Sequence, residues 1–268
     1  MQKILFYHGG PGLNSNAERN LLTPLYKSKH IDLHTWDEPS SLRGTLNIDS
    51  TNRFEDLLLD AEAFLLRHYE GKPLHLMGTS MGAQTIAYLQ QRHADKIATL
   101  IFSAPCFNIS QADQNTFALV ANDYKENNDL ENFEKLQSTV ARLSDRFDMN
   151  KQQSWELTLA NPHFLDYYWT NKSAQENYLA NFAPQEYGLD IQGFFAVRKS
   201  MYNLTITPVQ TKTIILYGAN DKVAPMKDEN PFLQDKFSNN KPYKMEHSSH
   251  YPHIEEAEKV LSIIMDNI

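Results

Sequence analysis

The stretch Pro73-Leu74-His75-Leu76-Met77-Gly78-Thr79-Ser80-Met81-Gly82 decides the fold class of this chain. Its first half is a short apolar run, typical of a strand buried on both faces of a parallel sheet. Its second half matches G-x-S-x-G, and a helical pattern from Met81 to Gln91 follows. This order predicts a turn that presents the Ser80 hydroxyl above the sheet edge as a nucleophile. The alternative is an ordinary turn in which Ser80 caps the helix.

Apolar runs of the same kind lie on both sides of this stretch. They are Ile4 to Tyr7, Ile31 to Trp36, Lys96 to Phe102, Lys212 to Tyr217 and Pro242 to Glu246. Helical patterns of period 3.6 separate them, as in the segment that begins at Phe54. Strands that alternate with helices predict an α/β fold, with a doubly wound, mostly parallel sheet of about six strands.

The segment from Cys106 to Thr211 breaks the alternation, because it carries helical patterns and no convincing strand. We therefore predict a core domain of residues 1–105 and 212–268, with a helical insertion at 106–211 before the penultimate strand. The insertion holds 16 of the 30 aromatic residues, some of which could line a pocket, for example Phe194, Phe195, Trp169 and Tyr168. Its 13 acids and 8 bases give a net charge of −5. We expect this charge to disfavour anionic substrates such as acyl-coenzyme A and to favour neutral, partly apolar ones.

The composition excludes several classes of protein. The 268 residues include 41% apolar and 22% charged residues, which is ordinary for a folded globular chain. A net charge of −8 argues against nucleic-acid binding, which needs a concentrated positive surface. The single cysteine, Cys106, excludes an intrachain disulfide and CxxC sites. No apolar run is long enough to span a membrane, and the N-terminus lacks signal-peptide features, so we expect a cytoplasmic protein.

The loop His8-Gly9-Gly10-Pro11-Gly12 follows the first predicted strand. Such a loop can direct backbone N–H groups at a developing negative charge. We predict that the N–H groups of Gly10 and Met81, the residue after the nucleophile, form an oxyanion hole. A flexible glycine turn is the alternative. A phosphate loop fits poorly, because no Gly-Lys-Ser/Thr follows.

Two strand-end segments supply candidates for the acid and the base. Asp221 follows the Lys212–Tyr217 strand, where its carboxylate can orient a histidine, or can simply close an Asx turn. His247, His250 and His253 lie between the last strand and the last helix. A metal site fits poorly, since Pro252 interrupts the repeat and no acidic or cysteine ligands accompany it. We predict His250 as the general base, with His247 as the second choice.

The order Ser80, Asp221, His250, with each residue after a parallel strand, is typical of one class of serine hydrolase. The chain resembles the α/β-hydrolase superfamily over nearly its whole length. The matching segments are His8–Gly12, Gly78–Gly82, Gly218-x-x-Asp221 and His250-x-Pro252-x-x-Glu255. The resemblance implies a Ser-His-Asp triad, a helical cap at 106–211 and no cofactor.

The chain departs from this family in two places. The family usually begins with a two-strand hairpin, whereas only two residues precede Lys3, so we expect the hairpin to be absent and the Ile31–Trp36 strand to lie at an edge. An exposed edge can recruit a second copy, so a homodimer is possible. The loop His8–Gly12 is similar to that of prolyl aminopeptidases, but Gly-Thr-Ser-Met-Gly differs from their Gly-Gly-Ser-Trp-Gly.

Three functions fit these residues. The first is a serine hydrolase that cleaves an ester or related acyl bond through an acyl-enzyme. The second keeps the triad in an aminopeptidase or a C–C bond hydrolase. The third is a hydrolase fold that binds a small ligand without turnover. The sequence favours the first of these.

Overall fold

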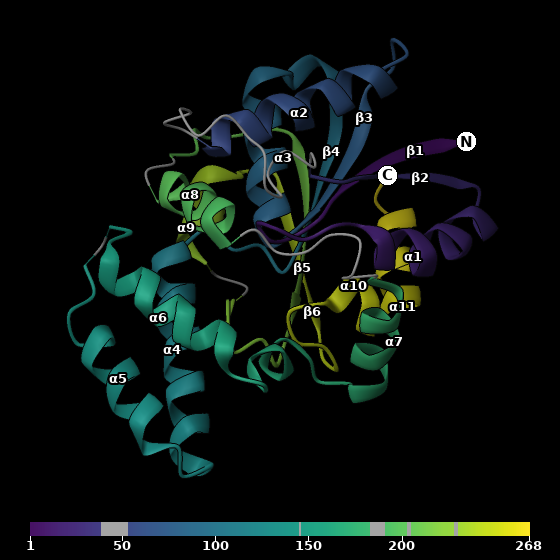
Figure 1. The fold of residues 1–268 in the computed structure, drawn as a ribbon. Coiled ribbons are helices and arrows are strands. Elements are labelled where there is room, and N and C mark those ends of the chain that lie inside the picture. Colours follow the sequence, from purple (N-terminus) through teal and green to yellow (C-terminus); the bar gives the residue numbers. More distant parts are fainter. Residues whose placement is uncertain (39–52, 145, 183–190, 203–204, 228–229) are drawn as a thin grey trace.

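A single sheet of six strands forms the centre of the molecule. The computed structural model describes residues 1–38, 53–144, 146–182, 191–202, 205–227 and 230–268 (Figure 1). The strands are β1 (Gln2–Tyr7), β2 (Ile31–Trp36), β3 (Leu74–Thr79), β4 (Ile97–Ser103), β5 (Lys212–Gly218) and β6 (Asn240–Met245). Their order is β2-β1-β3-β4-β5-β6, and every neighbouring pair is parallel. The predicted parallel sheet of six strands is confirmed, with β2 at an edge.

Helices cover both faces of this sheet. The helices of the core are α1 (Asn16–Ser28), α2 (Arg53–His68), α3 (Met81–Arg92), α9 (Pro231–Lys236), α10 (Pro252–Glu255), α11 (Ala257–Met265) and the short 3-10 helix η2 (Ala94–Lys96). One apolar cluster joins the sheet to α2 and α3, and a second joins it to α1 and α11. The doubly wound arrangement is therefore confirmed.

Alternation along each strand explains why the strands are apolar throughout. Leu5 and Tyr7 of β1 belong to the cluster on the α2 and α3 side, whereas Ile4 and Phe6 belong to the cluster on the α1 side. All four side chains are fully buried. Successive side chains of a strand point to opposite faces, so a sheet covered on both faces needs apolar residues at every position.

The parallel direction of the strands places all the predicted site segments at one edge. The carboxyl ends of β1, β3, β5 and β6 lead directly into the segments that contain Gly10, Ser80, Asp221 and His250. In open α/β sheets this edge is where ligands bind. The site is assembled from four loops that are far apart in the sequence.

Between β4 and β5 the regular elements in the described residues are all helices, joined by short non-helical segments and accompanied by one isolated β-bridge from Val209 to Phe237. The elements are α4 (Ile109–Glu126), α5 (Leu130–Val140), α6 (Met149–Ala160), the 3-10 helix η3 (Phe164–Tyr168), α7 (Lys172–Phe182) and α8 (Ile191–Met201). Helices α4, α5 and α6 extend away from the sheet at the lower left of Figure 1. They enclose an apolar cluster of their own, which includes Phe117, Leu136 and Trp155. Helix α7 packs against α1 and α8 packs against α2, so this segment is attached to the helices of both faces. Its role as a separate cap domain stays a prediction.

Strand β2 has one neighbour, β1, and so leaves one side open within the described sheet. Asp32 and His34 lie on this strand and are hydrogen-bonded to each other, with 2.8 Å between Nε2 and Oδ2. Charged groups on an edge strand discourage strand addition. Dimerisation through β2 stays a prediction. In the described residues, no helix combines the length and the apolar character that a membrane span needs.

Candidate active site

Ser80 occupies a strained turn between β3 and α3. Strand β3 ends at Thr79, helix α3 begins at Met81, and Ser80 between them has φ 51° and ψ −112°. Residues other than glycine rarely adopt a positive φ, and such strain is concentrated at functional sites. The N–H of Ser80 donates to the carbonyl of Ser103 at the end of β4, over 3.1 Å. The side chain of Ser80 makes no capping hydrogen bond to the helix, so the capping alternative does not describe this turn.

The second glycine of G-x-S-x-G allows α3 to begin in direct contact with β1. A Cβ atom on Gly82 would lie 2.1 Å from the carbonyl oxygen of Tyr7. A Cβ atom on Gly78 would lie 2.3 Å from the carbonyl oxygen of Gly82. Both distances are far inside van der Waals contact. The two glycines therefore set how closely the turn approaches the sheet.

Asp221 and His250 form a buried pair on the neighbouring loops. Nδ1 of His250 lies 2.7 Å from Oδ2 of Asp221, and both residues are at most 5% exposed. The other carboxylate oxygen, Oδ1, accepts the N–H groups of Val223 and Ala224, each over 2.9 Å. Asp221 thus closes an Asx-type turn with one oxygen and contacts the histidine with the other. The two contacts are compatible with each other, and the catalytic role of Asp221 stays a prediction.

The surroundings of Asp221 favour its ionised form. Burial alone would raise the pKa of this carboxyl group, but the charge and hydrogen bond of His250 oppose the burial. The N–H groups of Ala224 and Val223 act in the same direction, and the pKa of Asp221 is lower than its ordinary value. A carboxylate here holds Nδ1–H of His250 as a donor, which leaves Nε2 free to accept a proton.

The three histidines of the last loop have different surroundings. His247 is exposed, and its backbone N–H donates to Oε2 of Glu256 over 3.0 Å. His253 is fully buried in α10, where Nδ1 lies 2.9 Å from the hydroxyl of Ser103. His250 is the member of the three that contacts Asp221. The structure therefore favours the predicted choice of His250 over His247.

Ser80 and His250 line the same cavity, which has a volume of about 160 Å³. The rest of its lining is mostly apolar and comes from the strand-end loops and from α4, α6, η3 and α8. Of the four aromatic residues predicted for a pocket, Phe194 and Tyr168 line the cavity, and Trp169 and Phe195 do not. Within the described residues no hydrogen bond joins Ser80 to His250, a contact that commonly tightens only when substrate is bound. A larger cavity of about 450 Å³ lies beside it but contains neither residue.

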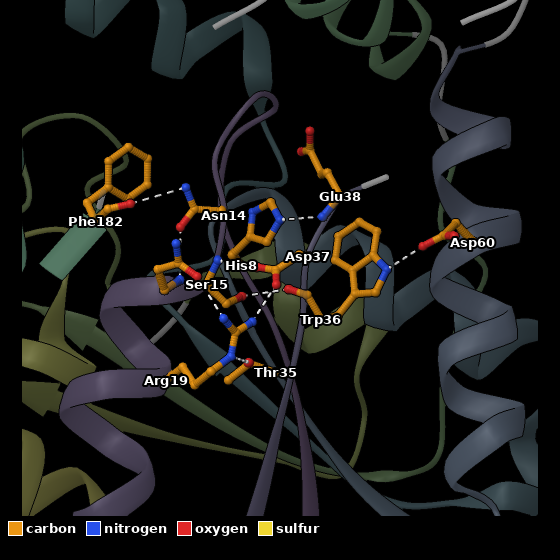
Figure 2. A network of polar contacts seen from close by, with 11 residues as sticks. His8, Asn14, Ser15, Arg19, Thr35, Trp36, Asp37, Glu38, Asp60 and Phe182 are labelled. Carbon is orange, nitrogen blue, oxygen red and sulfur yellow. Dashed lines mark hydrogen bonds and ion pairs between the residues drawn. The ribbon is translucent and has the colours of Figure 1, made fainter. Parts of the chain in front are cut away.

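Of the two residues predicted for the oxyanion hole, Gly10 lines this cavity and Met81 does not, so the oxyanion hole stays a prediction. Met81 is the first residue of α3, so its N–H has no acceptor within the helix. The loop after β2 holds the Gly10 loop in place. The carboxylate of Glu38 accepts the N–H of Gly12 over 2.9 Å. The N–H of Glu38 donates to Nε2 of His8 over 3.2 Å, as Figure 2 shows. The ring of His8 stacks on Trp36.

Glu38 was not predicted from the sequence, because it lies on a different loop from the glycine it contacts. Figure 2 shows that the polar network extends to Arg19, whose guanidinium group contacts Asp37 and Thr35. The network joins the loop after β1, the start of α1 and the loop after β2. No local pattern in the sequence marks such a contact between distant loops.

Glu255 connects the His250 loop to the helical segment. Its Oε2 accepts the N–H of Ser249 over 2.7 Å, and its Oε1 accepts the N–H groups of Thr170 and Asn171 over 2.7 and 2.8 Å. The N–H of His250 donates to the carbonyl of Tyr168 over 3.0 Å. The chain between η3 and α7 is therefore part of the support of His250. The sequence motif contained Glu255 but gave no sign of this contact.

Comparison with known proteins identifies the family of the chain. The sequence model of the family described as alpha/beta hydrolase fold matches residues 3–257. The chain belongs to this family. The resemblance predicted from the motifs is thus confirmed. No curated protein matches the chain by sequence.

Several solved structures of the same fold superpose on the chain. An esterase from Exiguobacterium antarcticum has a TM-score of 0.67 at 13% identity, covering 99% of this chain and 91% of that one. MenH from S. aureus has a TM-score of 0.60 at 18% identity, covering 99% and 92%. An epoxide hydrolase from Bacillus megaterium has a TM-score of 0.61 at 13% identity, covering 99% and 93%. At these identities the likeness extends to the α/β-hydrolase fold alone.

Proposed function

We propose that the protein is a serine hydrolase that cleaves an ester or related acyl bond through a Ser80-His250-Asp221 triad. One observation carries this proposal. Ser80, in a strained strand-to-helix turn, lines the same cavity as His250, and His250 is hydrogen-bonded to a buried carboxylate. This combination matches the roles of nucleophile, base and orienting acid in the order typical of the fold.

In the proposed mechanism the hydroxyl of Ser80 attacks the carbonyl carbon of the substrate, and Nε2 of His250 takes the hydroxyl proton. Asp221 stabilises the imidazolium that forms and holds its orientation. The N–H groups of Gly10 and Met81 donate to the oxygen that becomes negative. His250 then returns the proton to the leaving alcohol, which departs and leaves an acyl group on Ser80. A water molecule, deprotonated by His250, attacks the acyl carbon. The bond from that carbon to Oγ of Ser80 then breaks, His250 returns the proton to Oγ, and the acid is released.

The lining of the cavity bears on the alternatives. An aminopeptidase needs a group that holds the ammonium of its substrate, and such a group is usually a carboxylate. Among the described residues no acidic side chain lines the cavity of Ser80. The mostly apolar lining supports a small, partly apolar acyl compound over a peptide with a free amine.

Active-site labelling tests the proposal. The parent protein and the variants Ser80→Ala and His247→Ala are incubated with a fluorophosphonate probe, and the same proteins are assayed on p-nitrophenyl butyrate. We expect labelling and hydrolysis in the parent and in His247→Ala, and neither in Ser80→Ala. Labelling of the parent at a residue other than Ser80, or hydrolysis by Ser80→Ala at the parent rate, would refute the assignment. A parent that neither labels nor hydrolyses would favour a binding protein.

A further inference from the structure

The cavity that contains Ser80 is lined by one permanently charged side chain, that of Arg198 on α8, among the residues that the structure describes. No acidic side chain joins it there, although the segment 106–211 as a whole carries a net charge of −5. The charge next to the nucleophile is thus opposite in sign to that of the surrounding segment. Charge at the site, where water is largely excluded, acts on a bound substrate more strongly than charge on the outer surface.

A buried acid outside the cavity holds Arg198 in place. Its guanidinium group pairs with Oδ1 of Asp113, which is fully buried, and Tyr202 donates its hydroxyl to Oδ2 of the same carboxylate. The guanidinium carbon also lies 4.4 Å from the centre of the Trp155 ring. Asp113 does not line the cavity, whereas Arg198 does. The pair therefore presents its positive end to the cavity in a fixed orientation.

One donor of this guanidinium group is unused. Nε of Arg198 is buried and has no hydrogen-bond partner in the described part of the chain. A buried donor without an acceptor is unfavourable, but Nε itself is inaccessible to solvent. A group in the cavity reaches Arg198 through the 12% of its side chain that is exposed. The planar guanidinium group suits a carboxylate, to which it can donate two parallel hydrogen bonds.

The size of the cavity limits the group that reaches Arg198. A volume of about 160 Å³ is close to that of a cavity known to hold one benzene molecule, roughly 150 Å³. This space accepts a short chain of a few carbon atoms. A long acyl chain does not fit within it.

We propose that Arg198 binds a carboxylate carried by the substrate, so that the preferred substrates are esters with a short arm that ends in a carboxylate. This inference rests on the proposed esterase function. It revises the expectation of neutral substrates, which came from the net charge of the whole segment and not from the cavity. Arg198 acts here as a residue that determines specificity.

Matched pairs of esters test the inference, each pair differing only by a carboxylate or an isopropyl group of the same shape. Monoethyl glutarate and ethyl 5-methylhexanoate place the group on the acyl arm. The compounds 4-acetoxybutanoate and 4-methylpentyl acetate place it on the alcohol arm. Hydrolysis is followed by acid release at constant pH. We expect the parent to prefer the carboxylate in one of the two pairs, by about 10- to 100-fold in kcat/KM, as a charge-assisted hydrogen bond predicts.

Substitutions then assign the preference to Arg198. The double variant Arg198→Met/Asp113→Asn removes both charges of the pair, so no buried charge is left alone, and we expect the preference to disappear. Arg198→Lys keeps a cation beside Asp113 but loses the planar group, and we expect the preference to fall in part. Lys199→Met removes an exposed charge from the next position of the same helix, and the preference should remain. Urea unfolding of each variant shows that it is folded.

The outcomes separate the two proposals. If the parent hydrolyses the neutral members in a Ser80-dependent way and prefers them in both pairs, the carboxylate inference is wrong and the esterase proposal stands. A preference for the carboxylate that survives in the double variant also refutes the role of Arg198. If none of the four esters is hydrolysed, and the fluorophosphonate probe does not label Ser80, the esterase proposal itself fails.

Discussion

The carboxyl edge of the sheet and the helical segment between β4 and β5 line the same cavity but are held together in different ways. At the sheet edge, backbone contacts position the groups: Ser80 has a positive φ, and Gly82 lies against the backbone of β1. In the helical segment, contacts of buried charged side chains position the groups that line the cavity. Asp113 and Lys151 are both fully buried, the first paired with Arg198 and the second donating to the carbonyl of Arg146 over 3.0 Å. At the sheet edge, the free energy of unfolding should therefore fall when atoms are added. In the helical segment, it should fall when a buried charge is removed.

The largest effect is expected where the two regions meet, at His250. We expect His250→Ala to reduce kcat/KM for p-nitrophenyl butyrate by roughly 10⁴-fold, because triad members act as a unit. His247→Ala is the matched control on the same loop and should stay within about threefold of the parent, since its side chain is exposed. A greater loss in His247→Ala than in His250→Ala would move the base to His247.

Removing one member of the buried ion pair tests the helical segment. Arg198→Met leaves the fully buried carboxylate of Asp113 without its cation. We expect the free energy of unfolding to fall by about 3–5 kcal/mol, as for other buried pairs that lose one partner. The double variant Arg198→Met/Asp113→Asn should lose markedly less. Urea unfolding of the parent and both variants measures the difference, and equal losses would show that charge does not hold this segment.

Adding one methyl group tests the sheet edge. Gly82→Ala places a Cβ atom 2.1 Å from the carbonyl oxygen of Tyr7, so the backbone must move. We expect a loss of about 2–3 kcal/mol in the free energy of unfolding. Gly71→Ala is the control, because its φ of +82° disfavours alanine while no atom lies within 4 Å of the added Cβ. That variant should lose about 1 kcal/mol. Similar losses in the two variants would indicate that the turn adjusts to the extra atom.

The smallest effect concerns the pH dependence of stability. The folded-state pKa of Asp221 lies below its ordinary value of about 4, so the ionised carboxylate stabilises the fold above that pH. This contribution is lost as the pH falls through the folded-state pKa. Between pH 6 and pH 3, the free energy of unfolding should fall further in the parent than in Asp221→Asn. Urea unfolding at intermediate pH values tests this, and parallel curves would mean that Asp221 gains no stability from its ionisation.

The sequence alone determined the fold and the turn that holds Ser80, whose role as nucleophile stays a prediction. Both depend on local signals: apolar runs that alternate with helical patterns predict the parallel sheet, and G-x-S-x-G describes a single turn whose glycines contact nearby backbone. The position of Asp221 was also predictable. It follows closely after a strand, and the carboxyl ends of parallel strands all lie at one edge of the sheet, where Ser80 also lies. In each case the signal occupies a few neighbouring positions of the sequence, even where the contact it permits, such as that of Gly82 with Tyr7, joins distant segments.

Only the tertiary structure decided how the site is completed. The sequence could rank His247 and His250 but could not show which one meets Asp221, 29 residues away. It gave no sign of Glu38, and it predicted the charge of the helical segment but not that Arg198 would face the cavity. These facts depend on packing between segments distant in the sequence, where the direction of each side chain is set by the neighbours it meets. Net charge and periodicity describe a segment as a whole, and only three-dimensional contacts select the few side chains that reach the substrate.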